Sequence, residues 1–155
     1  MKLCTLCYLK KDDEVLLLHR NKKENDVHEG LWIGLGGKLE KGESPEDCVK
    51  REFKEESGLD IIAPKMRGVL TFPDFSKGED YYVFLYTAED YIGELIKDSP
   101  EGSLKWVEYE SILDYPTWEG DKIFLKWLQE KKSFFSATFT YKDDKLENYD
   151  VVFHE

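Results

Sequence analysis

Three glutamates that could bind a metal ion stand close together at Glu52, Glu55 and Glu56. If this stretch is helical, at about 100° per residue the three lie within about a third of the circumference. Like charges at these spacings repel each other, and Lys54, the one lysine among them, points elsewhere. Carboxylate oxygens are the ligands that Mg²⁺ and Mn²⁺ prefer. The cluster therefore predicts a site for a hard divalent cation.

The residues before this cluster predict a loop that leads into a helix. The loop, 36–43, carries glycines and ends at Glu43. Ser44 followed by Pro45 is a typical helix start, and Gly58 is a typical helix terminator. We therefore expect a helix from near Ser44 to Gly58, with its carboxylates beside the glycine-bearing loop.

Loop and helix together resemble the signature of the Nudix hydrolases. A glycine, a glutamate and an Arg-Glu-apolar-x-Glu-Glu-x-Gly-apolar run keep every spacing over 23 residues. The one mild departure is Phe53, where the family more often has an aliphatic residue. The plainer alternative is an acidic surface helix after a turn. The matching residues are Gly37, Glu43, Arg51, Glu52, Phe53, Glu55, Glu56, Gly58 and Leu59.

The resemblance implies an enzyme that hydrolyses a nucleoside diphosphate linked to another group, with Mg²⁺ as cofactor and Mn²⁺ as a substitute. Glu52 and Glu56 match the principal metal ligands of the family. Glu55 matches a further ligand or a carboxylate that positions water. The backbone around Gly36 and Gly37 matches another metal contact, through a main-chain carbonyl.

Other residues of the implied active site support or complete this set. Arg51 is expected to pair with Glu43 or Glu55 and orient them, and Glu43 is expected to brace the loop. Glu101 stands just before a predicted strand, where related triphosphatases place a further metal ligand or base; Glu94 is the substitute. The candidates for the general base are Glu55, Glu56 and Glu101.

Nearly the whole chain also resembles one group within that family, the oxidised-purine nucleoside triphosphatases, which remove 8-oxo-dGTP and 2-oxo-dATP. The likeness rests on residues 30–38, 118–121, 128–135 and 139–153. It implies a nucleoside triphosphate pyrophosphohydrolase that releases a monophosphate and pyrophosphate, which serves DNA repair by cleaning the nucleotide pool.

That second resemblance also implies how the base is bound. Trp118 falls where the group stacks the purine, and Asp121 falls where a carboxylate bonds the base edge. An aromatic face binds any base for ~1–3 kcal/mol, whereas buried polar groups supply selectivity. In the alternative, Trp118 is ordinary core and Asp121 only suits a helix start. The other substrate-binding candidates are Thr5, Arg20, Gly36 and Lys38.

Two positions depart from the pattern of this group. The asparagine of its base pocket is replaced by Ile33, which cannot form a hydrogen bond with a base, and the first of its paired acidic residues is replaced by Gly120. Base recognition is therefore expected to differ. Two alternatives stay open: another substrate, such as a dinucleoside polyphosphate or an RNA 5′ end, and a nucleotide-sensing module without catalysis.

Length and composition, with 41% apolar residues, predict one globular domain over residues 1–155, and the resemblance implies that it is a Nudix hydrolase domain. No apolar run is long enough to span a membrane and no signal peptide is visible, so we expect a cytoplasmic protein. The net charge of −11 argues against a duplex nucleic-acid partner, but a small nucleotide is compatible with it. The sequence leaves open whether the protein is a monomer or a homodimer. Cys4 and Cys7 should point to opposite faces of a strand, which disfavours a zinc or redox role.

The order of apolar and polar segments predicts strands around two helices. Periodicity alone leaves α+β or α/β open; the resemblance implies an α/β fold, the Nudix α/β/α sandwich with a mixed β-sheet between helices. Asn21–Gly30 and Pro73–Asp80 are expected to be polar loops, the latter a mobile lid, and Tyr81 and Tyr82 could be strand or pocket residues. The expected strands are 3–9, 14–19, 31–35, 61–72, 81–88, 93–96, 104–109, 134–141 and 145–152, with a turn at 111–113 and a second helix at 120–131.

Overall fold

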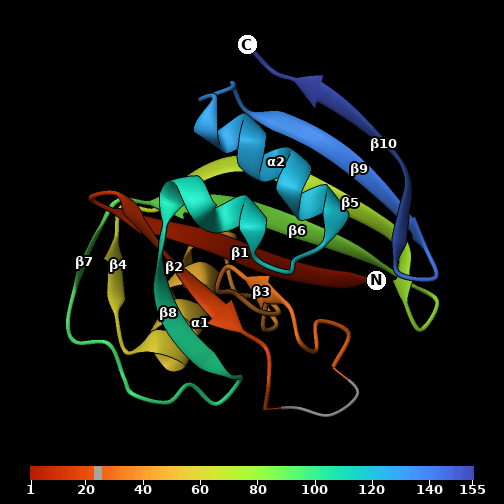
Figure 1. The fold of residues 1–155 in the computed structure, drawn as a ribbon. Helices are drawn as coiled ribbons and strands as arrows, with labels where there is room; N and C mark the ends of the chain where they lie inside the picture. The colour runs from red at the N-terminus through yellow and green to blue at the C-terminus, as the bar shows by residue number, and fades with distance from the viewer. Residues whose placement is uncertain (23–25) are drawn as a thin grey trace.

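The computed structural model describes residues 1–22 and 26–155 (Figure 1). Its elements, in chain order, are β1 (Lys2–Lys11), β2 (Glu14–His19), β3 (Trp32–Ile33), α1 (Pro45–Ser57), β4 (Asp60–Ile62), β5 (Lys65–Ser76), β6 (Glu79–Ala88), β7 (Asp90–Ile92), β8 (Ser103–Glu108), the 3₁₀ helix η1 (Tyr109–Asp114), α2 (Glu119–Gln129), β9 (Phe135–Lys142) and β10 (Lys145–Phe153).

The main sheet is mixed. Its strands follow the order β10-β9-β5-β6-β1-β2-β3, and β8 pairs with β2. β1 runs parallel to β6 and β5 runs parallel to β9, while the other neighbours are antiparallel. β4 and β7 form a separate two-stranded sheet.

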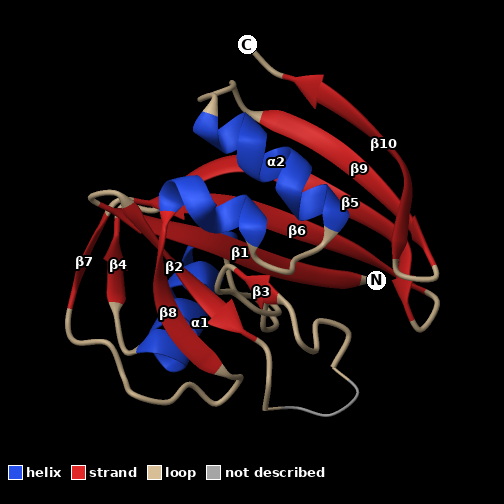
Figure 2. Cartoon of the chain, viewed as in Figure 1, coloured by secondary structure: helices blue, strands red, loops and turns tan. Residues whose placement is uncertain are grey.

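Both faces of the main sheet are buried around β2, as the alternation along this strand shows. Val15 and Leu17 join a core cluster with side chains of η1 and α2, whereas Leu16 and Leu18 join a cluster with side chains of α1. Successive strand residues point to opposite faces, so α1 and α2 cover opposite sides of the sheet (Figure 2). The predicted α/β/α sandwich is confirmed.

The glycine-bearing loop fills the space where β1 and β2 separate. These strands pair only near their turn, at Lys10 with Val15 and at Lys11 with Glu14. Farther back, the Cys7 N–H donates to the Leu35 carbonyl at 2.7 Å, and the Thr5 N–H donates to the Gly37 carbonyl at 2.8 Å. The loop is thus fixed along β1 before it enters α1.

The predicted ends of α1 are confirmed. The Ser44 hydroxyl accepts the Asp47 N–H at 3.1 Å, and Pro45 is the first helical residue. Gly58 ends the helix with a φ of 82°, a left-handed conformation that glycine adopts without steric cost.

Two strand predictions are wrong. The segment 61–72 is not one strand, because the chain turns at Ala63, which has a φ of 48°, so that β4 leaves the main sheet and pairs with β7. No strand forms at 93–96, because the strand in this region, β7, lies earlier in the chain and ends at Ile92. Beyond it, the Ile96 N–H donates to the Ser57 carbonyl at 2.9 Å and fastens the chain to the end of α1.

The predicted loop 73–80 is also wrong, since β5 continues to Ser76 and β6 begins at Glu79. This segment is therefore the tip of a hairpin. The described parts of the predicted loop 21–30 contain no helix or strand, and residues 23–25 lie outside the described residues.

The prediction that Cys4 and Cys7 point to opposite faces of a strand is confirmed. Cys7 lies in the α1-side cluster and Cys4 packs against the other, and both are free thiols, as is Cys48. In the described part of the chain, no helix has the length and apolar character needed to cross a membrane.

Candidate active site

A cavity of about 660 Å³ brings most of the predicted site residues together. Its walls come from β1, the β2–β3 connection, the glycine-bearing loop, α1, the β5–β6 hairpin and α2, which are far apart in the sequence. Arg51 and Glu55 are not part of its described lining. The predicted residues that line it are Thr5, Arg20, Gly36, Gly37, Lys38, Glu52, Glu56, Glu101, Trp118 and Asp121.

Three carboxylates on this cavity, Glu52, Glu56 and Glu101, form what we call the acidic group. The Glu56 carboxylate is buried and accepts the Gly36 N–H at 2.9 Å. Burial, helped by the charge of Glu52, raises the pKa of Glu56 to about 8. Burial also raises the pKa of Glu52, and Glu101 adds to both shifts. The negative charges of the acidic group are therefore not fully compensated by neighbouring basic groups.

The chemistry of this group fits a hard divalent cation. All three side chains offer oxygen, which is the ligand type of Mg²⁺ and Mn²⁺, and their mutual repulsion is relieved by positive charge. Among residues 1–22 and 26–155, no three acidic, histidine or cysteine side chains are already closed into a metal cluster.

Arg51 joins the loop to the helix, as predicted. Its Nε and Nη2 donate to both carboxylate oxygens of Glu43 at 2.7 and 2.9 Å, which lowers the pKa of Glu43 to about 2. Its Nη1 donates to Glu52 at 2.9 Å and to Glu55 at 3.3 Å, and Nη2 also reaches the Lys38 carbonyl at 3.1 Å. Arg51 therefore orients the carboxylates from outside the cavity.

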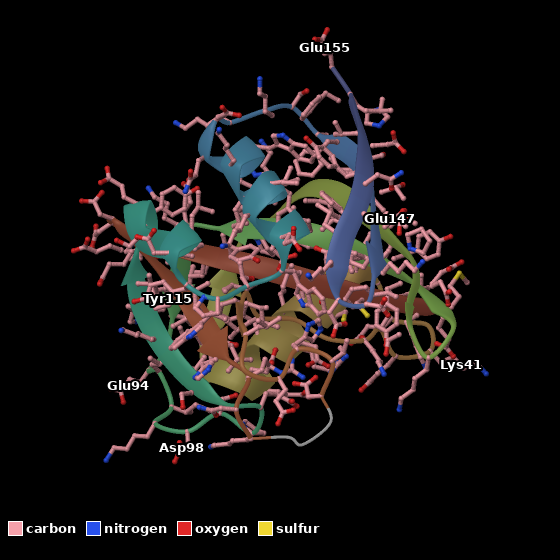
Figure 3. The ribbon with its side chains drawn as sticks, turned by 45° about the vertical axis from the view of Figure 1, so that its right-hand side comes forward. Lys41, Glu94, Asp98, Tyr115, Glu147 and Glu155 are labelled. Atoms are coloured by element: carbon pink, nitrogen blue, oxygen red, sulfur yellow. The ribbon has the colours of Figure 1, made fainter. Side chains whose placement is uncertain are left out.

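Glu55 lies apart from the acidic group. Its side chain is 58% exposed and forms an ion pair with Arg51. Glu94, the substitute for Glu101, is also exposed, and Figure 3 shows it at the outer edge of the molecule. The structure thus brings Glu101, but neither of these two, to the cavity.

The two glycines of the loop have different surroundings. The Gly37 carbonyl accepts from the Thr5 N–H and, at 3.5 Å, from the Thr5 hydroxyl, so it faces β1. The Gly36 N–H faces Glu56 instead. A Cβ at residue 37 would stand 2.5 and 2.7 Å from the carboxylate oxygens of Glu52, so only glycine leaves room for that carboxylate.

Arg20 links the acidic group to the β2–β3 connection. Its Nη2 lies 3.4 Å from a Glu101 carboxylate oxygen, and its Nε donates to Asp26 at 2.8 Å. Thr5 is buried, with its hydroxyl 3.4 Å from the Cys48 sulfur. Arg20 is therefore a predicted pocket residue whose side chain contacts a carboxylate of the acidic group.

Trp118 and Asp121 lie at the start of α2 and both line the cavity. The Trp118 Nε1–H donates to Nδ1 of His28 at 2.8 Å, and its ring meets the ring of Phe75 with centroids 5.0 Å apart. We call His28, Phe75 and Trp118 the aromatic wall. Asp121 is 5% exposed, and burial raises its pKa to about 7.

The two departures from the oxidised-purine pattern have structural counterparts. Ile33 is buried and gives the cavity an apolar side chain. Gly120 donates its N–H to the Tyr141 hydroxyl at 2.6 Å, and a Cβ there would lie 2.7 Å from that oxygen. An acidic side chain at position 120 thus has no room, and Asp121 is the only carboxylate of this pair.

Sequence reasoning missed His28, Phe75 and Asp26, which all line the cavity. His28 and Asp26 lie in a segment predicted only as a charged loop, and Phe75 lies in a segment predicted as a polar lid. The apolar Phe75 within that polar segment was the one signal available.

Comparisons with known proteins agree with this geometry. The family model of the NUDIX domain matches residues 3–128. The uncharacterized Nudix hydrolase YvcI of Bacillus subtilis (strain 168) is 37% identical over 142 residues, which is 88% of this chain and 85% of that protein. The oxidized purine nucleoside triphosphate hydrolase of Mus musculus is 30% identical over 97% of this chain and 94% of its own.

Solved structures give the same result. The MutT protein from Bacillus halodurans superposes with a TM-score of 0.87 at 32% identity, covering 97% of each chain. The family model matches most of the chain, the signature spacings are intact, and the fold brings Gly37, Glu52 and Glu56 of the signature to one cavity. Together these findings establish the family. The chain belongs to the Nudix hydrolase family.

Proposed function

We propose that this Nudix hydrolase is a metal-dependent nucleoside triphosphate pyrophosphohydrolase of the cytoplasm. It would convert 8-oxo-dGTP or a related purine triphosphate to the monophosphate and pyrophosphate. The observation that carries the proposal is a single cavity lined by both the acidic group and the aromatic wall. A volume of about 660 Å³ lies within the ~300–1,000 Å³ of small-molecule sites. The similarity to the mouse enzyme of that name supports the same substrate class.

The acidic group would hold Mg²⁺. Glu52 and Glu56 are its proposed main ligands, with Glu101 and the Gly36 carbonyl as further ones. The Gly37 carbonyl, the other one expected from the sequence, faces Thr5 instead. When bound, the cation screens phosphate charge and acidifies a water molecule. Arg51 holds Glu52 in place from behind, and the absence of a side chain at Gly37 leaves that carboxylate its space.

The attacking water needs a proton acceptor within reach. Glu56 and Glu101 line the cavity, whereas Glu55 is exposed and paired with Arg51. We therefore place this role on Glu56 or Glu101, and give Glu55 a supporting role through Arg51.

Cationic side chains around the same cavity would receive the phosphates. Although the net charge is −11, four basic residues of the described chain line the cavity, and they would pair with the phosphates once a cation neutralises the acidic group. Arg20 and Lys38, both predicted from the sequence, are among them. The four are Lys2, Arg20, Lys38 and Lys77.

The aromatic wall would bind the base. An indole face stacks on a purine with little dependence on its identity, which is the proposed role of Trp118. Asp121, buried beside it, would form a hydrogen bond with the base edge and supply selectivity.

The test is to incubate the full chain with Mg²⁺ and 8-oxo-dGTP and to identify the products. The proposal expects nucleoside monophosphate and pyrophosphate in equal amounts. Glu56→Gln should lower kcat by about 10²-fold or more, and the matched variant Glu55→Gln should lose less.

Release of inorganic phosphate, or a Glu56→Gln variant with near wild-type turnover, would overturn the proposed mechanism. Faster hydrolysis of a dinucleoside polyphosphate or of an RNA 5′ end would keep the chemistry and replace the substrate.

A further inference from the structure

His28 stands in a turn that is anchored on both sides. The Arg20 Nε donates to Asp26 at 2.8 Å, and the other oxygen of Asp26 accepts the His28 N–H at 3.2 Å. The Leu31 N–H donates to the His28 carbonyl at 2.9 Å. These contacts hold the imidazole against α2, although Trp118 is 90 residues away in the sequence.

The hydrogen bond to Trp118 fixes which nitrogen of His28 carries the proton. An indole N–H can only donate, so His28 Nδ1, at 2.8 Å, must be the acceptor. A neutral imidazole then carries its hydrogen on Nε2. Burial, with the nearby charge of Arg20, lowers the pKa of His28 to about 4, so the ring is neutral near pH 7. Since His28 lines the cavity, what it has left to offer a ligand is an N–H donor.

The residues around the aromatic wall indicate which base edge the His28 donor would recognise. Ile33, at the position where the oxidised-purine group has an asparagine, is an apolar residue of the cavity lining. Asp121, when ionised, can only accept. One donor and one acceptor beside a stacking ring match a purine that presents a carbonyl oxygen next to an N–H. Guanine has an acceptor at position 6, whereas adenine has an amino donor there.

We propose that His28 determines specificity for 6-oxopurines: its Nε2–H donates to the 6-oxygen, its Nδ1 orients the Trp118 indole, and Asp121 accepts from the purine N1–H. This inference rests on the proposed function for the identity of the ligand as a nucleotide. It assigns to His28 the donor that Ile33 cannot provide.

Two matched nucleotides test the inference without requiring catalysis. Deoxyinosine and deoxyadenosine monophosphates differ in their bases only at position 6 and in the N1 proton that follows from it. Titration calorimetry on the full chain should give a Kd for dIMP lower by about tenfold or more than that for dAMP, because dIMP forms both proposed hydrogen bonds and dAMP forms neither.

Variants of His28 locate the source of that preference. His28→Phe should weaken dIMP binding by about tenfold and leave only the part of the preference that Asp121 supplies, while dAMP binding changes less. His28→Gln, which keeps both an acceptor and a donor, should restore most of the preference. The matched control is His154→Phe, since His154 is exposed near the chain end and contacts Ser136; it should leave both Kd values unchanged.

Three results would overturn the inference: equal binding of dIMP and dAMP by the wild type, a preference of undiminished size in His28→Phe, or an equal loss of both ligands in that variant. The first result decides the matter even if His28→Phe does not fold. A clear dIMP preference in a protein that does not hydrolyse dITP would uphold the role of His28 and refute the proposed hydrolysis, so the two failures are distinguishable.

Discussion

The substitution Gly37→Ala tests how closely the loop controls the acidic group. The new methyl carbon would stand 2.5 and 2.7 Å from the two oxygens of Glu52, whereas non-bonded heavy atoms settle near ~3.5 Å. The carboxylate must therefore retreat by about 1 Å, and a displacement of that size costs about 10²-fold in rate. Such a loss corresponds to about 2.7 kcal/mol of activation free energy.

The assay is steady-state kinetics with Mg²⁺ on the substrate that the wild type turns over fastest, with thermal unfolding measured in parallel. The control is Gly42→Ala in the same loop. Gly42 has a φ of 77° and no atom within 4 Å of an added Cβ, so alanine there should cost about 1–2 kcal/mol of stability and leave kcat unchanged. A Gly37→Ala enzyme with wild-type kcat would show that the position of the Glu52 carboxylate does not limit catalysis.

Three further perturbations follow from the site. Folding raises the pKa of Glu56 to about 8 and that of Asp121 to about 7, so between about pH 5 and 8 the folded state holds more protons than the unfolded state, and stability falls as pH rises. Thermal unfolding of the metal-free protein measures this, and a flat or rising profile would contradict it. Trp118→Ala should weaken nucleotide binding by the ~1–3 kcal/mol that stacking contributes, while Trp118→Phe should keep most of the affinity. Equal losses of affinity in the two variants, measured by titration, would speak against stacking. Arg51→Lys cannot keep the paired bonds to Glu43 and should weaken Mg²⁺ binding by about 10- to 100-fold, and unchanged affinity in calorimetry would refute that role.

The helix of the signature could be predicted because its information is local. Ser44, Pro45 and Gly58 mark its ends within a few residues of the backbone groups that they satisfy. The salt bridge between Arg51 and Glu43 was predictable for the same reason, since only eight positions separate them.

Strand errors arose where an apolar pattern continued through a change of direction. Residues 61–72 keep a strand-like composition, yet Ala63 adopts a left-handed conformation just before Pro64. A proline restricts the residue before it, so the break had a signal, but nothing local shows that β4 should pair with β7.

The parts of the site that could not be predicted depend on contacts over long sequence distances. Helical spacing placed Glu55 beside Glu52 and Glu56, but Arg51 draws it outward. No periodicity connects His28 to Trp118, because their contact exists only once the β2–β3 connection packs against α2.

The most direct test of the account compares kcat/KM for 8-oxo-dGTP and dGTP with Mg²⁺, with Glu56→Gln as the inactive control. We predict turnover that requires Glu56 and a ratio above about tenfold in favour of 8-oxo-dGTP, or ~1.4 kcal/mol of transition-state discrimination. Such a ratio would mean that the aromatic wall and Asp121 select the oxidised base although position 33 carries the apolar Ile33. A ratio near one, with fast turnover, would contradict the proposed role in removing oxidised purines.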